Sequence, residues 1–302
     1  MNFSPLLLSA LTFSLSAAEI PVADAFGEIR KVTTSPARTV ICYPSLLEIW
    51  LDCGGFPAGM HTPRKADPLP PGLENVPRVG SYMHPNMEAV VRLKPDLVIL
   101  SGMTGRHRAF GELLRKSGIE VLHLKYDNYS DYARLAGIFS SILATRSAST
   151  VCEKVQKEVD AIIRRCSGRK GPTFLVLFFN GAEFRAETSR AHAAYIFTAL
   201  GGRNILNSTG SAVLRAERVS FSPEELLLKD PDRIFLIPGA KSDALNREAL
   251  RKFLENPSMR NLKAVRTNRL HVLPSDLFQY KPNRRFPEAF RYAENLLYGK
   301  QP

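Results

Sequence analysis

The chain has 302 residues, of which 44% are hydrophobic and 23% are charged, a composition typical of a globular protein with about two domains. Its formal net charge is +12, but the basic residues are scattered and form no run or nucleic-acid-reading motif. No segment reaches the ~20 uninterrupted apolar residues of a comfortable membrane span. We therefore expect a soluble mature protein, a monomer, with no nucleic-acid partner.

The first eighteen residues, "MNFSPLLLSALTFSLSAA", lack charged side chains and contain an apolar run that ends in small residues at Ser16 and Ala18. This pattern is typical of a secretory signal peptide, although its usual basic start is missing. A buried N-terminal helix is the alternative. We expect residues 1–18 to be cleaved near Ala18 and the mature protein to be periplasmic, with no lipid anchor because no cysteine follows directly.

Short apolar runs alternate with amphipathic ones in the first half. In chain order the pattern predicts a strand over 39–43, a helix over 45–53, a short helix over 88–93, a strand over 97–100, a helix over 108–116 and a strand over 120–124. Alternating strands and helices indicate βαβ units and a mainly parallel sheet.

A long helical pattern without proline follows from about residue 131 to 166, with a slip in its apolar face near 145–149. The second half then repeats the order of the first. We expect strands over 173–179, 233–237 and 269–273, and helices over 190–200, 223–229 and 247–256.

One unit occurs in both halves. The stretch "PNMEAVVRLKPDLVIL" at 85–100 and the stretch "FSPEELLLKDPDRIFLI" at 221–237 place a glutamate, a proline and an aspartate at one constant offset. The pairs are Glu88 and Glu224, Pro95 and Pro231, and Asp96 and Asp232. Each proline ends a helix and sets the turn into the next strand.

The predicted fold class is α/β, with two Rossmann-like lobes whose parallel-type sheets are joined by a long backbone helix. We assign residues 19–129 to the N-terminal lobe, 130–168 to the linking helix and 169–302 to the C-terminal lobe. Ligands of open α/β sheets bind outside the carboxyl ends of the strands. Two facing lobes would therefore hold a ligand in a cleft between them.

Four cysteines remain in a chain that we expect to be exported. Cys152 and Cys166 cannot pair within one helix, because that spacing separates them by ~21 Å. Cys42 ends a predicted strand and Cys53 the following helix, so a bond between them stays open beside the alternative of two free thiols. No C-x-x-C spacing indicates zinc or redox chemistry.

The sequence resembles the helix-backboned solute-binding proteins of ABC importers, which take up ferric siderophores, haem, cobalamin and related chelates. The resemblance rests on "VGSYMHPNMEAVVRLKPDLVIL", "ALGGRNIL", "SFSPEELLLKDPDRIFLI", "AVRTNRLHVLPSDLF" and "PNRRFPEAFRYAENLLYG", and covers about 38–299. It implies a binding protein, not an enzyme, without a cofactor of its own, that delivers an iron- or cobalt-containing chelate to the importer permease. It also implies that Glu88 and Glu224 dock on the permease; stabilisation of a helix N-terminus is the alternative role.

Loops that follow the predicted strands should line the cleft, and they are rich in arginine and aromatic residues. The arginine fork suits carboxylate, catecholate or phosphate oxygens, and flat rings suit a macrocycle or aryl group. The candidate ligand-binding residues are Tyr43, His61, Arg64, Tyr82, His84, Met103, Arg106, Phe184, Arg185, Arg215, Phe278, Tyr280 and Arg284. His61, Tyr82 and His84 are candidates to contact the metal of the chelate; ordinary surface-loop positions are the alternative.

Two other functions use related architectures. A chelatase-like enzyme that inserts metal into a tetrapyrrole needs a His/Glu pair, for which Glu183 and His192 are the available residues. A bare zinc or manganese binder needs several histidine and acidic ligands from both lobes, and the chain has six histidines. The signal peptide and the paired glutamates have no part in a chelatase. For the bare-metal binder, no histidine lies clearly in a cleft loop of the second lobe.

Overall fold

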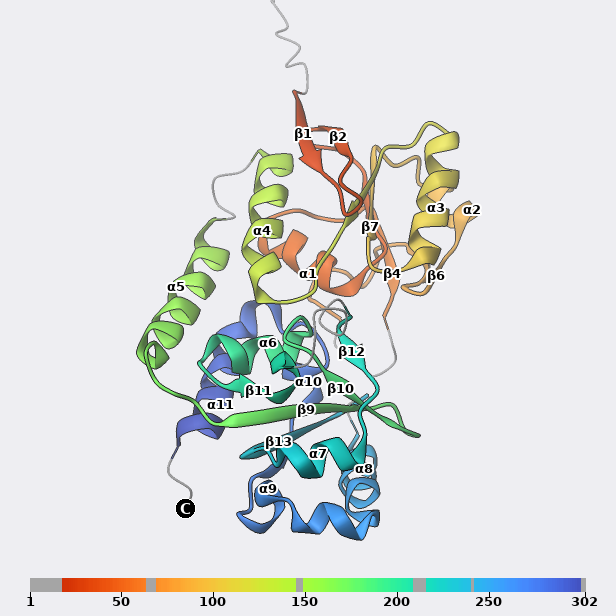
Figure 1. The fold of residues 1–302 in the computed structure, drawn as a ribbon. Helices are drawn as coiled ribbons and strands as arrows, with labels where there is room; N and C mark the ends of the chain where they lie inside the picture. Colours follow the sequence, from red (N-terminus) through yellow and green to blue (C-terminus); the bar gives the residue numbers. More distant parts are fainter. Residues whose placement is uncertain (1–17, 64–68, 145–148, 209–215, 240–241, 300–302) are drawn as a thin grey trace, which may run out of the picture.

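The computed structural model describes residues 18–63, 69–144, 149–208, 216–239 and 242–299. Two α/β lobes lie one above the other in Figure 1. Ahead of the first lobe, β1 (Glu19–Ala23) and β2 (Ile29–Thr33) form an antiparallel hairpin that the sequence pattern did not predict. Only one side chain of each strand is buried, Val22 and Val32, so the hairpin lacks the apolar alternation that marks a strand.

The N-terminal lobe contains a six-stranded sheet in the order β6-β5-β4-β3-β7-β8, parallel except for the β5–β6 pair. Its strands are β3 (Thr39–Ile41), β4 (Gly59–Thr62), β5 (Arg78–Ser81), β6 (His84–Pro85), β7 (Leu97–Ser101) and β8 (Val121–Leu124). Side chains alternate between the faces, so Ile41 packs under α1 (Pro44–Asp52) and α4 (Tyr129–Leu143). Val40 packs on the other face, with α2 (Met87–Arg92) and α3 (Gly105–Lys116).

The C-terminal lobe has a second six-stranded sheet, in the order β12-β10-β9-β13-β14 with β11 beside β9. Its strands are β9 (Thr173–Phe179), β10 (Phe184–Glu187), β11 (Arg203–Asn204), β12 (Arg218–Val219), β13 (Arg233–Pro238) and β14 (Leu270–Val272). Strands β9, β11, β13 and β14 are parallel to one another, and β10 and β12 are antiparallel to their neighbours. The predicted strands over 173–179, 233–237 and 269–273 are thus confirmed, within one or two residues at their ends.

Helices cover both faces of this second sheet. The face toward the first lobe carries α6 (His192–Ala199), α10 (Ser275–Phe278) and α11 (Phe286–Tyr298), and the short helix η4 (Asn283–Arg285) connects the last two. The far face carries η1 (Ile205–Ser208), α7 (Pro223–Lys229), α8 (Asp243–Glu255), η3 (Pro257–Asn261) and α9 (Lys263–Arg266). The two-lobed α/β prediction is therefore confirmed.

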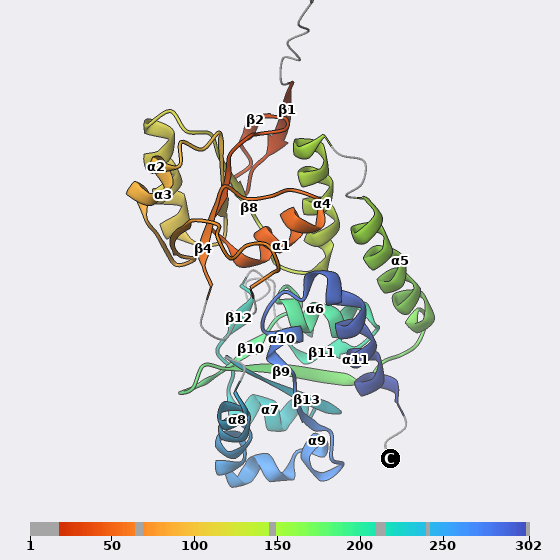
Figure 2. The same ribbon diagram turned by 180° about the vertical axis from the view of Figure 1, so that it is seen from behind.

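The linking segment is helical, as expected, but it is made of two helices. Helix α4 ends at Leu143, where Ala144 adopts a left-handed backbone with φ 52°, and α5 (Ser149–Cys166) follows. In both views α4 lies beside the N-terminal lobe, whereas α5 runs down to the C-terminal lobe and packs along α11 (Figures 1 and 2). One continuous apolar core runs from α1 through α4, α5 and α11 to α6, so the lobes share packed side chains.

The repeated unit has the same local structure in both halves. A polar side chain caps the short helix, Asn86 for α2 and Ser222 for α7. A residue with positive φ ends it, Lys94 at 47° and Asp230 at 35°. The aspartate then accepts backbone N–H groups at the start of the neighbouring central strand. Asp96 Oδ2 bonds the N–H groups of Ala37 and Arg38, and Asp232 Oδ2 bonds that of Thr173, two of these at 2.8 Å. In both copies the aspartate thus joins the turn after the short helix to the start of the neighbouring strand.

Candidate functional site

A cleft of about 430 Å³ lies between the two lobes and is lined by residues of both. The N-terminal lobe contributes Tyr43, Pro44, Ser45, Leu47, Glu48, Met60, His61, Pro63, Pro70 and Tyr82, and the C-terminal lobe contributes Asp276, Gln279, Tyr280, Lys281, Pro282 and Arg285. Pockets that bind small molecules or cofactors usually measure ≈ 300–1,000 Å³. The cleft thus has the size and the position expected for a ligand held between lobes.

Aromatic residues form the N-terminal wall of the cleft. Tyr43 at the end of β3 packs edge to face on Tyr82, with ring centroids 6.0 Å apart, and on His107, at 6.3 Å. The buried His107 holds the Tyr82 loop: its Nδ1 accepts from the Ser101 N–H at 2.9 Å and its Nε2–H donates to the Tyr82 carbonyl at 2.7 Å. Burial lowers the pKa of His107, which favours this neutral tautomer. His107 of α3 therefore holds the Tyr82 loop in place.

The C-terminal wall comes from the segment after α10 and brings a cation into the cleft. Lys281 Nζ lies 5.9 Å from the centre of the Tyr126 ring. Burial lowers the pKa of Lys281, and the neighbouring carboxylates Glu217 and Asp127 oppose part of that shift. An anionic group placed in the cleft would favour the protonated ammonium in the same way. A ligand that carries negative charge would meet Lys281 and Arg285 on this wall, beside the carboxylate of Asp276.

Behind the same wall, Arg218 makes two hydrogen bonds, 2.8 and 3.0 Å long, to one oxygen of the buried Glu187. The guanidinium also stacks 3.8 Å above the Phe178 ring and donates to Gln279 Oε1 at 3.2 Å. Gln279 itself lines the cleft. These contacts position the Gln279–Pro282 segment without placing the charge of Arg218 directly on the cleft surface.

Four of the residues predicted from sequence line the cleft: Tyr43, His61, Tyr82 and Tyr280. His61 on β4 is 5% exposed and lies beside Met60. Sequence reasoning did not single out Glu48, Met60, Gln279 or Lys281. Met60, Gln279 and Lys281 belong to segments that were expected to line the cleft. Only the polar side chains of Gln279 and Lys281 and the thioether of Met60 could have marked them as contact residues.

The other predicted residues do not line this cleft. His84, Met103 and Arg106 are exposed on the N-terminal lobe. Phe184 packs into the core beneath α8, with its ring 4.8 Å from that of Phe179, and the half-buried Arg185 follows it on β10. Phe278 is 1% exposed, and its ring centroid lies 5.8 Å from that of Phe197 in a stacked arrangement. Its ring is therefore part of the core. Arg64 and Arg215 lie outside the described residues.

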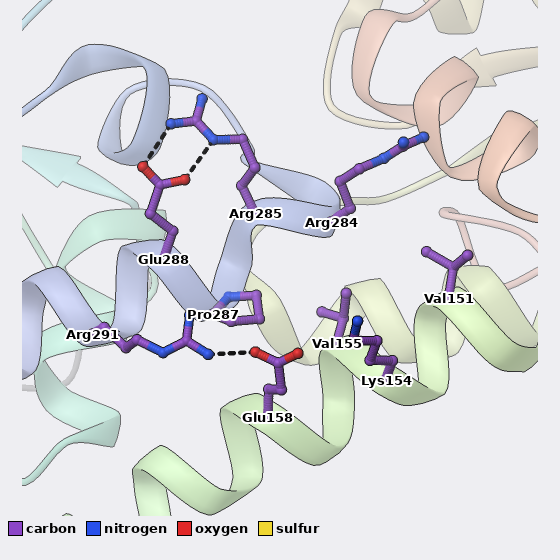
Figure 3. Close-up of a pocket in the computed structure, with 9 residues that line it drawn as sticks. All are labelled: Val151, Lys154, Val155, Glu158, Arg284, Arg285, Pro287, Glu288 and Arg291. Carbon is purple, nitrogen blue, oxygen red and sulfur yellow. Dashed lines mark hydrogen bonds and ion pairs between the residues drawn. The ribbon is translucent and has the colours of Figure 1, made fainter.

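Arg284 belongs to a second hollow, an outer groove of about 530 Å³ between α5 and the start of α11. Figure 3 shows Arg284 pointing away from Arg285, and its guanidinium pairs with Asp52 of α1. The groove's other arginines are also paired, Arg285 with Glu288 and Arg291 with Glu158. Its charges are thus largely satisfied within the protein, and we regard the cleft between the lobes as the candidate site.

The chelatase alternative relied on Glu183 and His192, and neither lines the cleft. Glu183 is exposed in the turn between β9 and β10. His192 is buried, its Nε2 bonds the Leu277 carbonyl at 3.0 Å, and burial lowers its pKa to about 3. The bare-metal alternative needs a cluster of ligands. In the part of the chain that the structure describes, no three His, Cys, Asp or Glu side chains are arranged to hold a metal ion.

The two glutamates of the repeated unit are both exposed in the first turn of their helices. The Glu88 side chain is 80% exposed and pairs with Arg92 one turn later, 2.5 Å away. Glu224 accepts a hydrogen bond from Ser222, which lowers the pKa of its carboxyl. Helix α2 lies on the N-terminal lobe and α7 on the C-terminal lobe (Figure 1). Each lobe therefore presents the glutamate of its repeated unit to solvent.

The lobes are also joined beside the cleft, by Asn283 of η4. Its side chain is fully buried, and it accepts a hydrogen bond from the Tyr126 hydroxyl at 2.6 Å. Its amide group donates to the Glu48 carboxylate and, at 3.4 Å, to the Ser45 carbonyl. The backbone of Asn283 has φ 47°, a conformation that asparagine tolerates better than most residues. Asn283 therefore ties the C-terminal lobe to Tyr126 and to the start of α1, and the latter lines the cleft.

No helix within the described ranges combines the length and apolarity needed to cross a membrane.

Comparison with known proteins places these features in a family. A family model described as periplasmic binding protein matches residues 40–277. The "High-affinity heme uptake system protein IsdE" of Staphylococcus aureus (strain MRSA252) is 25% identical over 283 residues, which cover 90% of this chain and 88% of that protein.

Solved structures share the fold of this chain. The structure of S. aureus IsdE complexed with heme has a TM-score of 0.71 and 21% identity, over 86% of this chain and 98% of that one. Staphylococcus aureus SirA complexed with staphyloferrin B has a TM-score of 0.70 and 19% identity, over 93% and 100%. The periplasmic vitamin B12 binding protein BtuF of Vibrio cholerae has a TM-score of 0.69 and 18% identity, over 87% and 97%. These likenesses show a shared fold.

Proposed function

The chain belongs to the periplasmic binding protein family, and we propose that it captures a metal chelate outside the cytoplasm and delivers it to the permease of an ABC importer. The observation that carries the proposal is the cleft, to which both lobes contribute. Its size suits a small ligand, its tyrosines suit a flat or aryl group, and Lys281 suits an acidic one. Proteins similar to this chain are named for haem, staphyloferrin B and vitamin B12.

The chelate itself supplies the metal, so the protein's part is recognition. Tyr43, Tyr82 and Tyr280 would pack on the organic part of the ligand, and Lys281 would face an acidic group. His61 is the candidate for direct contact with the iron or cobalt, because a neutral imidazole is a good ligand for such metals and this residue lies on the cleft wall.

Delivery requires export and docking. We propose that the segment 1–17, which lies outside the described residues, is part of the signal peptide. We also propose that Glu88 and Glu224 contact the permease. Their exposure on separate lobes is compatible with this role, since a partner that holds both carboxylates can sense or change the distance between the lobes.

Titration calorimetry with a panel of haem, ferric siderophores and cobalamin tests the binding proposal. We expect one chelate class to bind the purified protein with one-to-one stoichiometry. The double variant Tyr82→Ala/Tyr280→Ala should bind it about tenfold more weakly or worse, because each lost ring contact is worth about 0.5–1.5 kcal/mol in addition to its buried area. Phe56→Ala, which removes an exposed ring outside the cleft, should bind normally.

Two results would contradict the proposal. Tight binding of free zinc or manganese without any chelate would favour the bare-metal alternative. Unchanged affinity in the Tyr82→Ala/Tyr280→Ala protein would place the ligand elsewhere.

A further inference from the structure

Two of the four cysteines meet in the structure although about 100 residues separate them in the sequence. Cys53 lies at the C-terminal end of α1, and Cys152 lies in the first turns of α5. Both are buried, at 0% and 3% exposure, and their side chains are hydrogen-bonded to each other. From the sequence, Cys42 was the only candidate partner for Cys53.

Helix α4 brings the two sulfur atoms together. Cys53 Sγ lies 3.6 Å from the Ala136 carbonyl and 4.0 Å from Ser140 Oγ, and Cys152 Sγ lies 3.4 Å from the Tyr132 hydroxyl. Tyr132, Ala136 and Ser140 occupy successive turns on one face of α4. The ends of α1 and α5 thus approach the same strip of α4. Figures 1 and 2 show α1 and α5 on opposite sides of α4.

The other two cysteines have no such arrangement. Cys42 packs on the face of the N-terminal sheet that α2 and α3 cover, whereas Cys53 packs on the opposite face with α1 and α4. The open possibility of a bond between Cys42 and Cys53 is therefore not compatible with the fold. Cys166, at the end of α5, contacts Glu294 of α11.

We propose that Cys53 and Cys152 form a disulfide in the exported protein, which fastens the linking helix α5 to α1 of the N-terminal lobe. The inference rests on the proposed function in one respect: a disulfide needs the oxidising compartment that an exported protein enters. Because α5 packs along α11 of the C-terminal lobe, the bond also restrains the position of one lobe relative to the other.

The chemistry is thiol–disulfide exchange with an external disulfide, such as oxidised glutathione or the disulfide of a thiol oxidoreductase, which acts while the chain folds and the sulfurs are accessible. The Cys152 thiolate attacks one sulfur of this oxidant, forms a mixed disulfide and releases a thiolate. Cys53 then loses its proton and attacks the Cys152 sulfur, which releases the second thiolate. The two protein thiols are oxidised, and the oxidant is reduced to two thiols.

In the folded protein the surroundings stabilise the Cys152 thiolate more than the Cys53 thiolate. The hydrogen bond from Cys53 lowers the pKa of the Cys152 thiol, and the Tyr132 hydroxyl acts in the same direction, whereas burial opposes the shift. The same pairing and burial raise the pKa of Cys53.

Counting free thiols tests the proposal on the full chain. Protein is refolded in a glutathione redox buffer and then denatured in the presence of N-ethylmaleimide, either directly or after reduction. Mass spectrometry then gives the number of labels on each sample. We expect two labels before reduction, on Cys42 and Cys166, and four after it. Proteolysis should give one cross-linked peptide pair that contains Cys53 and Cys152. The variants Cys42→Ser and Cys166→Ser should keep the cross-link, and Cys53→Ser should lose it.

Thermal unfolding gives a second measurement. A bond that closes a loop of about 100 residues should raise the melting temperature by roughly 5–10 °C, so a reducing agent should lower it by that amount. The double variant Cys53→Ser/Cys152→Ser should show no such shift.

Four labels before reduction, or a cross-link that involves Cys42 or Cys166, would overturn the proposal. Chelate titration of the same refolded sample separates this outcome from failure of the proposed function. Binding with four free thiols overturns only the disulfide, and a disulfide-linked protein that binds no chelate overturns only the proposed ligand.

Discussion

Reversing the charges of Glu88 and Glu224 together should abolish chelate uptake in cells and leave chelate binding by the purified protein unchanged. Both carboxylates are exposed, on separate lobes, and neither lines the cleft. If they pair with basic residues of the permease, the variant Glu88→Lys/Glu224→Lys replaces attraction by repulsion at two contacts. Ion pairs that become partly desolvated at an interface contribute strongly to affinity, and like charges there are costly. Each single reversal should weaken uptake, because both lobes must be held.

The matched control is Glu112→Lys/Glu248→Lys. These glutamates are also on helices, α3 and α8, and each pairs with an arginine of its own helix, Arg108 and Arg251. The control should be transported normally, which separates docking from a general effect of added positive charge. If the two glutamates only stabilise helix N-termini, the double reversal will lower the melting temperature slightly and uptake will stay normal.

Replacing Asn283 by alanine should lower the free energy of unfolding by about 2–4 kcal/mol. The change removes the partner of the buried Tyr126 hydroxyl and the amide that bonds Glu48, and it places alanine at a positive φ. A loss of that size corresponds to roughly 3–6 °C in melting temperature for a protein of this length. Differential scanning calorimetry measures it directly.

Two further variants separate the loss of the hydrogen bonds from the strain of the positive φ. Asn283→Gly accepts the positive φ and loses only the hydrogen bonds, so it should recover part of the stability. Asn261→Ala, at an exposed position of η3, should change the melting temperature by less than about 1 °C. A loss for Asn283→Ala as small as that of Asn261→Ala would mean that this side chain does not hold the lobes together.

The sequence allowed the framework of both sheets to be predicted because their central strands are continuous apolar runs. The run "TFLVLFF" is β9, and the prediction for "PEELLLK" coincides with α7. Edge strands such as β11 and β12 have only two residues each, too few for any pattern. The break after α4 had no glycine or proline to mark it, since Ala144 adopts the left-handed conformation instead.

The candidate site was predicted less completely than the fold. The rule that strand ends face a ligand located the loops of Tyr43, His61, Tyr82 and Tyr280. It could not say which side chains in those loops point inward, so Arg284 was expected in the cleft although it reaches Asp52. Phe278 was expected there too, but its neighbours in the core decide its position. The meeting of Cys53 with Cys152 depends on how three helices pack, which local patterns do not encode.

Anomalous diffraction at the absorption edge of the chelate's iron or cobalt tests the central claim most directly. Crystals of the protein grown with the chelate that binds in titration would show where the metal lies. We expect a single strong peak between the lobes, bordered by Tyr82 and His61 on one side and by Tyr280 and Lys281 on the other. A peak in the outer groove beside Arg284 and Arg291, or none between the lobes of a protein that binds the chelate, would contradict it.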